Sequence, residues 1–239
     1  MDLELLSRFN AARSGRRAVV LVTPLEAGAA GRQRIVTQAD DLIDNLASDP
    51  FGTEISARLL SGKSGIVEGA DGSRAFLTVS VPPPRLVLIG AVHIAQALLP
   101  MAGIAGFDVT VIDPRTAFAT PERFAGGRLL AEWPEDVLAD VALDPYTAVA
   151  ALTHDPKIDD VPLKAALEAN CFYVGALGSR KTHGARRTRL LEAGVTDAAF
   201  ARIDAPIGAD IGAASPAEIA VAVLANVIAA LRKGGERRP

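Results

Sequence analysis

A set of residues suited to holding a small anionic ligand follows the apolar runs of this chain. The set combines glycines, which let a ligand approach the backbone, with imidazole, carboxyl, hydroxyl and guanidinium groups. These candidate ligand-binding residues are Gly90, His93, Asp113, Arg115, His154, Asp155, Gly178, Ser179 and Arg180. Guanidinium groups and the backbone amides of a helix start favour phosphate or another anion, and His154 also has the chemistry to transfer a proton. We assign none of these residues to catalysis or to a metal ion.

Residues 85–113, RLVLIGAVHIAQALLPMAGIAGFDVTVID, predict a strand, a turn, a helix and a second strand. The apolar run 86–89 is typical of a parallel strand buried on both faces, and Gly90 then permits a tight turn. Apolar residues recur at helical spacing over 94–102, and a second apolar run ends at Asp113. In a dinucleotide-binding α/β unit, an acid roughly 20 residues after the glycine turn bonds a ribose hydroxyl. Asp113 has this position.

The glycine turn departs from the dinucleotide-binding pattern GxGxxG/A. Val92 stands where the second glycine of the pattern would let the backbone approach a pyrophosphate. A β-branched side chain at this position restricts the backbone dihedrals and occupies space near the ligand. The sequence therefore predicts the α/β fold but leaves two alternatives for its pocket: a working dinucleotide site, or a site whose ligand is lost or altered.

Another buried strand is predicted at 147–152, and His154 and Asp155 follow its end. In open parallel sheets ligands bind beyond the carboxyl ends of the strands, so we expect His154 on the same edge as His93. The alternative is a loop histidine held by its neighbour Asp155. Arg115 also has two interpretations, a bidentate phosphate ligand or a solvated surface arginine.

Positive charge collects after the strand predicted at 172–177. Gly178, Ser179 and Arg180 open a long helix, whose N-terminus adds backbone donors and a favourable dipole for an anion. We expect Ser179 and Arg180 to contact the ligand. A solvated basic face is expected to contain the arginines that follow them, Arg186, Arg187 and Arg189.

The chain is predicted to have two domains. Residues 1–81 are expected to form a small N-terminal α+β domain, with a helix over 39–47 among its elements. Prolines 82–84 cannot complete a strand ladder and are predicted to be a linker. Residues 85–239 are expected to form an α/β domain of Rossmann-like type, a parallel sheet with helices on both faces. The long apolar last helix should pack on the sheet or contribute to a homodimer interface.

Composition narrows the functional class. The formal charge is 25 basic minus 28 acidic residues, or −3, and aromatic residues make up 5%, so nothing indicates a nucleic-acid surface. The single cysteine, Cys171, excludes an intrachain disulfide and a multi-cysteine metal site, and we expect it to be a core thiol. We find neither the apolar core of a signal peptide nor a run of about 18 uncharged apolar residues that would predict a membrane span. We therefore expect a cytoplasmic protein.

Several segments together resemble the XdhC/CoxI family, accessory factors of xanthine and carbon monoxide dehydrogenases. They cover nearly all of residues 82–231 and read PPPRLVLIGAVHIAQAL, GFDVTVIDPRTAFATPERF, LTHDPKIDD, FYVGALGSRKTH and APIGADIGAASPAEIAVAVLA. The resemblance implies a chaperone, without turnover of its own, that carries the molybdenum cofactor (molybdopterin). It also implies that the cofactor is sulfurated with a cysteine desulfurase and inserted into an apo molybdenum hydroxylase.

The sequence departs from this family at two places. Many members have GAGH where this chain has GAVH at 90–93, so a nucleotide-like ligand is expected to bind differently. Many members also carry a glycine and cysteine motif near the N-terminus, whereas residues 1–81 contain no cysteine, which favours cofactor storage or handover over sulfur carriage. Two other functions stay open: an NAD(P)-dependent oxidoreductase, based on the strand, helix and Asp113 layout, and a partner-binding module with a vestigial pocket.

Overall fold

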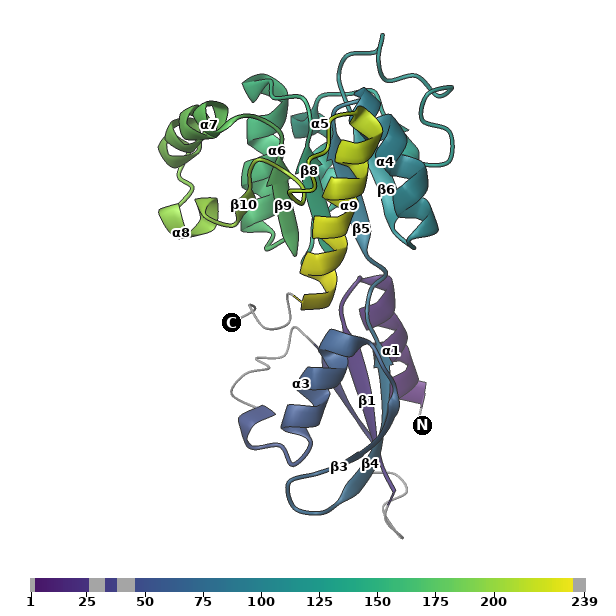
Figure 1. The fold of residues 1–239 in the computed structure, drawn as a ribbon. Helices are drawn as coiled ribbons and strands as arrows, with labels where there is room; N and C mark the ends of the chain where they lie inside the picture. The colour runs from purple at the N-terminus through teal and green to yellow at the C-terminus, as the bar shows by residue number, and fades with distance from the viewer. Residues whose placement is uncertain (1–2, 26–32, 38–45, 234–239) are drawn as a thin grey trace. The chain divides into compact units, whose positions relative to one another are not determined.

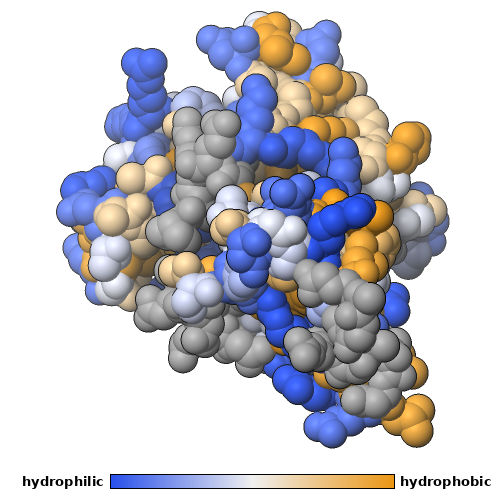
Figure 2. Space-filling model, turned by 90° about the horizontal axis from the view of Figure 1, so that it is seen from below, coloured by the Kyte–Doolittle hydropathy of each residue, from blue (hydrophilic) through white to orange (hydrophobic). Residues whose placement is uncertain are grey.

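The chain divides into two compact units, residues 1–82 and residues 83–239. The computed structural model describes residues 3–25, 33–37 and 46–233. The helix expected over 39–47 falls mainly on residues outside this described part. No helix of the described residues is long and apolar enough to cross a membrane. On the face of the molecule shown in Figure 2, hydrophobic residues are interspersed with hydrophilic ones.

The first unit contains an antiparallel sheet in the order β2-β1-β4-β3. Its elements are α1 (Leu3–Ser14), β1 (Val19–Pro24), β2 (Arg34–Thr37), α3 (Gly52–Ser61), β3 (Gly65–Glu68) and β4 (Arg74–Ser80). The strands β1 and β4 pair over their full length, from Val19 opposite Ser80 to Pro24 opposite Ala75. Alternate residues of these strands pack with Ile55 of α3 in a small core.

The second unit contains a six-stranded parallel sheet in the order β10-β9-β8-β5-β6-β7 (Figure 1). Its elements are β5 (Arg85–Ile89), α4 (His93–Ile104), β6 (Asp108–Ile112), β7 (Arg128–Leu130), α5 (Pro134–Val141), β8 (Thr147–Ala151), α6 (Pro156–Glu168), β9 (Tyr173–Ala176), α7 (Arg180–Glu192), α8 (Asp197–Phe200), β10 (Ile203–Asp204) and α9 (Pro216–Lys233). From the central β5 the chain moves outward to β6 and β7, and then returns to β8 and moves out on the other side. This reversal creates a topological switch point between β5 and β8, the place where open α/β sheets bind ligands.

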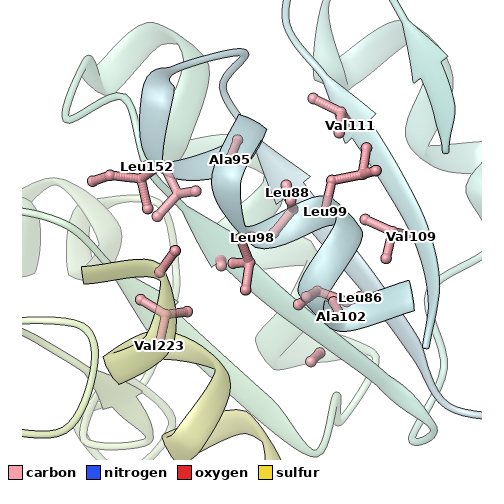
Figure 3. Close-up of a cluster of buried hydrophobic side chains, with 14 of the residues drawn as sticks. Leu86, Leu88, Ala95, Leu98, Leu99, Ala102, Val109, Val111, Leu152 and Val223 are labelled. Atoms are coloured by element: carbon pink, nitrogen blue, oxygen red, sulfur yellow. The ribbon is translucent and has the colours of Figure 1, made fainter. Parts of the chain in front are cut away.

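Both faces of the parallel sheet are covered by helices because alternate residues of each strand point to opposite sides. Leu88 of β5 faces α4 and α9, where it packs in one core with Leu98 and Val223 (Figure 3). Ile89 faces the opposite side, in a second core formed with α5, α6, α7 and α8. Full burial of such side chains contributes about 1.5–3 kcal/mol each. The predicted fold class, a Rossmann-like parallel sheet with helices on both faces plus a small N-terminal α+β domain, is confirmed.

Candidate functional site

Four neighbouring strands end at the same edge of the parallel sheet. Ile89, the last residue of β5, lies opposite both Ile112 of β6 and Ala151 of β8, and Ala151 lies opposite Ala176 of β9. The segments that follow these residues therefore leave the sheet side by side, at an edge that we call the rim. The candidate residues carried by these segments are Gly90, His93, Asp113, Arg115, His154, Asp155, Gly178, Ser179 and Arg180.

The ends of β5 and β8 approach each other closely at Gly90. Gly90 has φ +114°, in the region that favours glycine, and its amide donates to the carbonyl of Ile112 at 2.8 Å. A Cβ atom added at Gly90 would lie 2.5 Å from Cγ2 of Thr153, the second residue after β8. Glycine is therefore required here both by the backbone dihedral and by the close approach of the two strand ends.

The turn that opens α4 accommodates Val92 without strain. Val92 has φ −92° and ψ 171°, an extended conformation that suits a β-branched residue, and it packs partly against the core below. His93, the first residue of the helix, is exposed. The α4 N-terminus has no side-chain cap, so its first amides lack that intramolecular acceptor. The departure from the glycine pattern changes the space near the turn but leaves a helix start at the rim.

Asp113 is completely buried, and both of its oxygens are already hydrogen-bonded. Oδ1 accepts from the backbone amide and from Nε of Arg115, both at 2.9 Å. Oδ2 accepts from Nη2 of Arg115 at 2.7 Å and from the amide of Ala91 at 2.6 Å. Burial opposes ionisation, but these hydrogen bonds outweigh it and hold the pKa of Asp113 below its ordinary value. A ribose hydroxyl could bond this carboxylate only by displacing Arg115 or Ala91.

The loop after β6 supplies two further residues that the sequence did not single out. The guanidinium carbon of Arg115 lies 5.0 Å from the ring centre of Phe118, and this ring is about half exposed. Nη1 of Arg123 donates to the carbonyls of Ala91 and Phe118 and so ties this loop to the glycine turn. Nothing in the local sequence pattern distinguishes Arg123 from a surface arginine.

In the segment after β8, one candidate residue caps a helix and the other has an exposed side chain. Asp155 caps the N-terminus of α6, because its Oδ1 accepts from the amide of Lys157 at 3.0 Å. His154 is exposed and has φ +54°, which is unusual for a residue other than glycine. The hydroxyl of Thr153 is buried and donates to Oδ1 of Asp159 at 2.6 Å. Of the two candidates in this segment, His154 has its side chain available at the rim and Asp155 is engaged as a helix cap.

The segment after β9 forms a capped helix start. The Oγ of Ser179 accepts from the amide of Thr182 at 3.2 Å, and Arg180 is exposed at the first position of α7. Gly178 has φ +133°, and a Cβ atom added to it would lie 3.0 Å from Cγ2 of Thr182. This combination of a glycine, a serine cap and a helix N-terminus is suited to an anion.

The expectation of a solvated basic face on α7 is wrong for Arg186. Its side chain is 2% exposed, and it lies 4.0 Å from the equally buried carboxylate of Asp159 on α6. Arg187 and Arg189 do lie on more exposed positions, and they form ion pairs with Asp197 and Asp160. The run of basic residues in the sequence did not reveal which of them would face inward.

Metal ligands do not gather at the rim. Among the residues that the structure describes, no group of three or more histidine, cysteine and acidic side chains is placed to hold a metal ion. The cysteine expected in the core, Cys171, is fully buried, and burial raises the pKa of its thiol to about 12. The rim thus combines a switch point where Gly90 brings two strand ends close together with the N-termini of helices. It also carries two exposed histidines, His93 and His154, and the guanidinium groups of Arg115 and Arg180.

Three bacterial proteins are similar to this chain. The "Uncharacterized protein YqeB" of Escherichia coli is 36% identical over 155 residues, which are 64% of this chain and 28% of that protein. A protein of Bacillus subtilis named as a probable subunit of xanthine dehydrogenase is 34% identical over 64% of this chain and 44% of that protein. The "Molybdenum cofactor insertion chaperone PaoD" of Escherichia coli is 33% identical over 61% of this chain and 40% of that protein. The matched part is thus less than half the length of each relative.

The fold itself is shared with a solved structure. A xanthine dehydrogenase from Bacillus halodurans superimposes with a TM-score of 0.56 over 96% of this chain and 80% of that chain, at 19% sequence identity. Residues 86–227, which contain every candidate residue of the rim, match the family described as the XdhC Rossmann domain. The resemblance noted from the sequence is confirmed, and this chain belongs to the XdhC family.

Proposed function

We propose that this protein binds the molybdenum cofactor at the rim and delivers it to an apo molybdenum hydroxylase, such as a xanthine or carbon monoxide dehydrogenase. Family membership supports the proposal, as does the similarity to a relative named as a molybdenum cofactor insertion chaperone. The name of another relative points to xanthine dehydrogenase as the enzyme served. On this proposal the chain holds and transfers a cofactor and has no turnover of its own.

The observation that carries the proposal is the state of Asp113. A dinucleotide-dependent dehydrogenase of this topology uses the acid at this place to bond a ribose hydroxyl. Here the carboxylate is buried, and all its hydrogen bonds go to Arg115 and to the Ala91 amide. Asp113 is therefore not free to accept from a ribose hydroxyl, which argues against a nicotinamide nucleotide bound in the usual way and leaves a cofactor held by its other groups as the better match.

The parts of the cofactor match the chemistry of different segments of the rim. Its phosphate needs anion donors, which the start of α7 at Gly178, Ser179 and Arg180 can supply. The polar edge of its pterin needs hydrogen-bonding groups, for which His93 and His154 are exposed on neighbouring segments. We place the cofactor across the switch point, with its phosphate toward α7.

Sulfuration of the cofactor would need a sulfur donor outside these residues. Cys171 is the one cysteine of the chain, and it is fully buried with its thiol kept protonated. The thiolate is the nucleophile in sulfur transfer, so a thiol of this kind cannot carry a persulfide to the rim. We therefore propose that a cysteine desulfurase delivers sulfur directly to the bound cofactor, with this chain as the holder.

A nucleotide ligand is the second candidate, because the strand order matches that of dinucleotide-binding sheets. Arg115 lies where such proteins place an arginine for a ribose phosphate. Titration with NADP and NAD, followed by thermal shift, would separate this function from cofactor delivery. A nicotinamide-dependent turnover would replace our proposal.

Anaerobic co-purification from a molybdenum-replete host tests the proposal. The bound pterin is detected by fluorescence after oxidation, in the wild type, in Arg180→Ala, in His154→Ala and in Arg187→Ala as a control. Arg187 has the same charge and the same helix as Arg180 but pairs with Asp197. We expect pterin in the wild type and in the control and its loss from the other two variants. Folded wild-type protein that retains no pterin would contradict the proposal.

We also propose that the protein forms a homodimer through α9. The outer side of this helix exposes Val221 and Ile228, while its inner side packs on the sheet. Apolar residues seven positions apart on one helix face are typical of a helix-mediated contact. Light scattering should give twice the chain mass for the wild type and the chain mass for Val221→Asp with Ile228→Asp. A wild-type monomer at high concentration would contradict the homodimer.

A further inference from the structure

A buried ion pair lies directly beneath the loop that joins β9 to α7. Arg186 comes from the second turn of α7, and its Nη2 donates to the carbonyl of Leu177 at 2.9 Å. The same nitrogen lies 4.0 Å from Oδ2 of Asp159, in the first turn of α6. The exposed fractions of the two side chains are 2% and 1%. The guanidinium group is thus held against the residue that precedes Gly178.

This pair is incompletely hydrogen-bonded. Nε and Nη1 of Arg186 and Oδ2 of Asp159 are buried atoms with no partner among the described residues. Buried polar groups nearly always have partners, and an unpartnered charged group is costly. At 4.0 Å and without a direct hydrogen bond, Asp159 neutralises the guanidinium only in part. A positive potential therefore remains at the loop above it, because a low dielectric screens charge weakly.

The loop itself has the geometry of an anion site. Gly178 has a backbone dihedral that favours glycine, and Ser179 caps the amide of Thr182. The amides of Arg180 and Lys181, at the first positions of α7, have no acceptor within the helix. The helix dipole and the free amides together favour an anion at this point. The buried guanidinium of Arg186 adds a full positive charge that is independent of both.

We propose that the first turn of α7 is a binding site for a phosphate-type dianion, in which the buried Arg186 supplies positive charge from beneath and Asp159 takes up a proton when the anion binds. The inference rests on the proposed function in that it names the phosphate end of the cofactor as the ligand of this loop. Arg186 acts through Leu177 and through its field, so it is a positioning residue that does not touch the anion.

The surroundings of Asp159 favour this proton uptake. Burial is the main reason that the pKa of its carboxyl is raised to about 6, against which the Thr153 hydroxyl and Arg186 act. From α7, Arg189 is neutralised by Asp160, and His183 has a pKa lowered by burial and by Arg186. From the rim, Arg115 interacts electrostatically with both Asp155 and Asp159. The acids of α5, the other helix against α6, are all exposed: Glu135, Asp136 and Asp140.

The sign of the pH dependence follows from these charges. An anion above Arg186 competes with Asp159 for the positive charge, so it raises the carboxyl pKa further. Binding then takes up a proton, and affinity increases as the pH falls from above the pKa of the complex toward about 6. If the pKa rises by about half a unit, the affinity changes roughly threefold over this range.

Sulfate is the probe of choice, because its charge does not change over this pH range and the full chain can be used without cofactor. We would follow backbone amide signals by NMR during sulfate titrations at several pH values. We expect shifts at Gly178 to Thr182, tighter binding at lower pH, and a pH-independent, tight response in Asp159→Asn. The asparagine variant keeps an acceptor for the hydroxyl of Thr153.

Two variants with the same change in charge separate Arg186 from a general basic surface. Arg186→Gln should weaken sulfate binding at least several-fold and abolish its pH dependence, whereas Arg187→Gln on the same helix should leave both unchanged. If Arg186→Gln is not folded, Arg186→Lys, which keeps the charge, should retain binding and pH dependence. Equal weakening by both glutamine variants, or wild-type affinity independent of pH, would overturn the proposal.

The outcome is distinguishable from failure of cofactor delivery. Sulfate bound at α7 in a protein that never retains pterin would leave this site standing and remove the proposed function. If the wild type and a folded Arg186→Gln retain pterin equally and neither responds to sulfate, the proposed function would stand and the anion site at α7 would be removed.

Discussion

Arg115 holds both carboxylate oxygens of Asp113, with Nε donating to Oδ1 at 2.9 Å and Nη2 to Oδ2 at 2.7 Å. The two residues stand two positions apart, directly after β6. This bidentate pair turns the acid of a dinucleotide-type strand end into an anchor for an arginine. It also fixes the guanidinium plane beside Phe118 at the edge of the rim.

Replacement of Asp113 should destabilise the domain. In Asp113→Asn an amide group would face donors from Arg115 and Ala91, and we expect a loss of about 2 kcal/mol of unfolding free energy. The pKa of Asp113 is lowered in the folded state, so its contribution is present above the unfolded value of about 3.9 and is lost as the pH falls through the folded value. Urea unfolding of wild type and variant at several pH values measures both effects.

Asp108→Asn is the matched control, because Asp108 lies at the other end of the same strand and is exposed. It should change the unfolding free energy by less than about 0.5 kcal/mol. Equal effects of the two substitutions would show that the pair with Arg115 is unimportant for stability.

Gly90→Ala should be strongly destabilising. The new Cβ atom would lie 2.5 Å from Cγ2 of Thr153, and the residue would have φ +114°. The steric and backbone terms together should cost at least about 2 kcal/mol, and thermal unfolding would show a lower midpoint.

Gly103→Ala serves as the control for that substitution. Gly103 lies within α4, and a Cβ atom added there would have no neighbour within 4 Å, so alanine should be neutral or stabilise by about 0.5–1 kcal/mol. A tolerated alanine at position 90 would contradict the tight approach of β5 and β8 at the switch point.

Asp159 should make the protein less stable as the pH rises from about 4 to about 6. Its folded pKa is raised to about 6, so its favourable contribution is complete below the unfolded pKa and is lost as the pH rises through the folded one. The change is on the order of 3 kcal/mol by linkage, because the pKa rises by about two units. Chemical denaturation across this range should show the slope in the wild type and its absence in Asp159→Asn. A wild type without the slope would mean that Asp159 is ionised in the apo protein throughout.

Cys171 should be inert toward thiol reagents in the folded protein. Its side chain is fully buried, and burial raises the pKa of the thiol to about 12, so little thiolate is available at neutral pH. Labelling with a chromogenic disulfide reagent should proceed only on the timescale of unfolding, and fully in denaturant. Rapid labelling under native conditions would contradict the argument that sulfur must come from a partner.

The local pattern of the sequence was sufficient for the four central strands of the parallel sheet and for its rim. Apolar runs followed by glycine or by polar residues predicted β5, β6, β8 and β9, because strands buried on both faces must be apolar throughout. Parallel strands end at a common edge, so His93, Asp113, His154 and Ser179 could be expected there from their positions alone. Their roles as ligand contacts stay predictions, because position at the rim does not specify what binds.

Only the tertiary structure decided which charged groups remain available. The basic run of α7 lacks an apolar stripe, so its inward face depends on how α7 packs on α6, and this packing buries Arg186 against Asp159. Similarly, the side-chain directions at a strand end determined that Asp113 bonds Arg115 instead of facing the rim. Hydrophobic periodicity is local and can be read along the chain, whereas the pairing of charges depends on distances between segments that meet only in the folded protein.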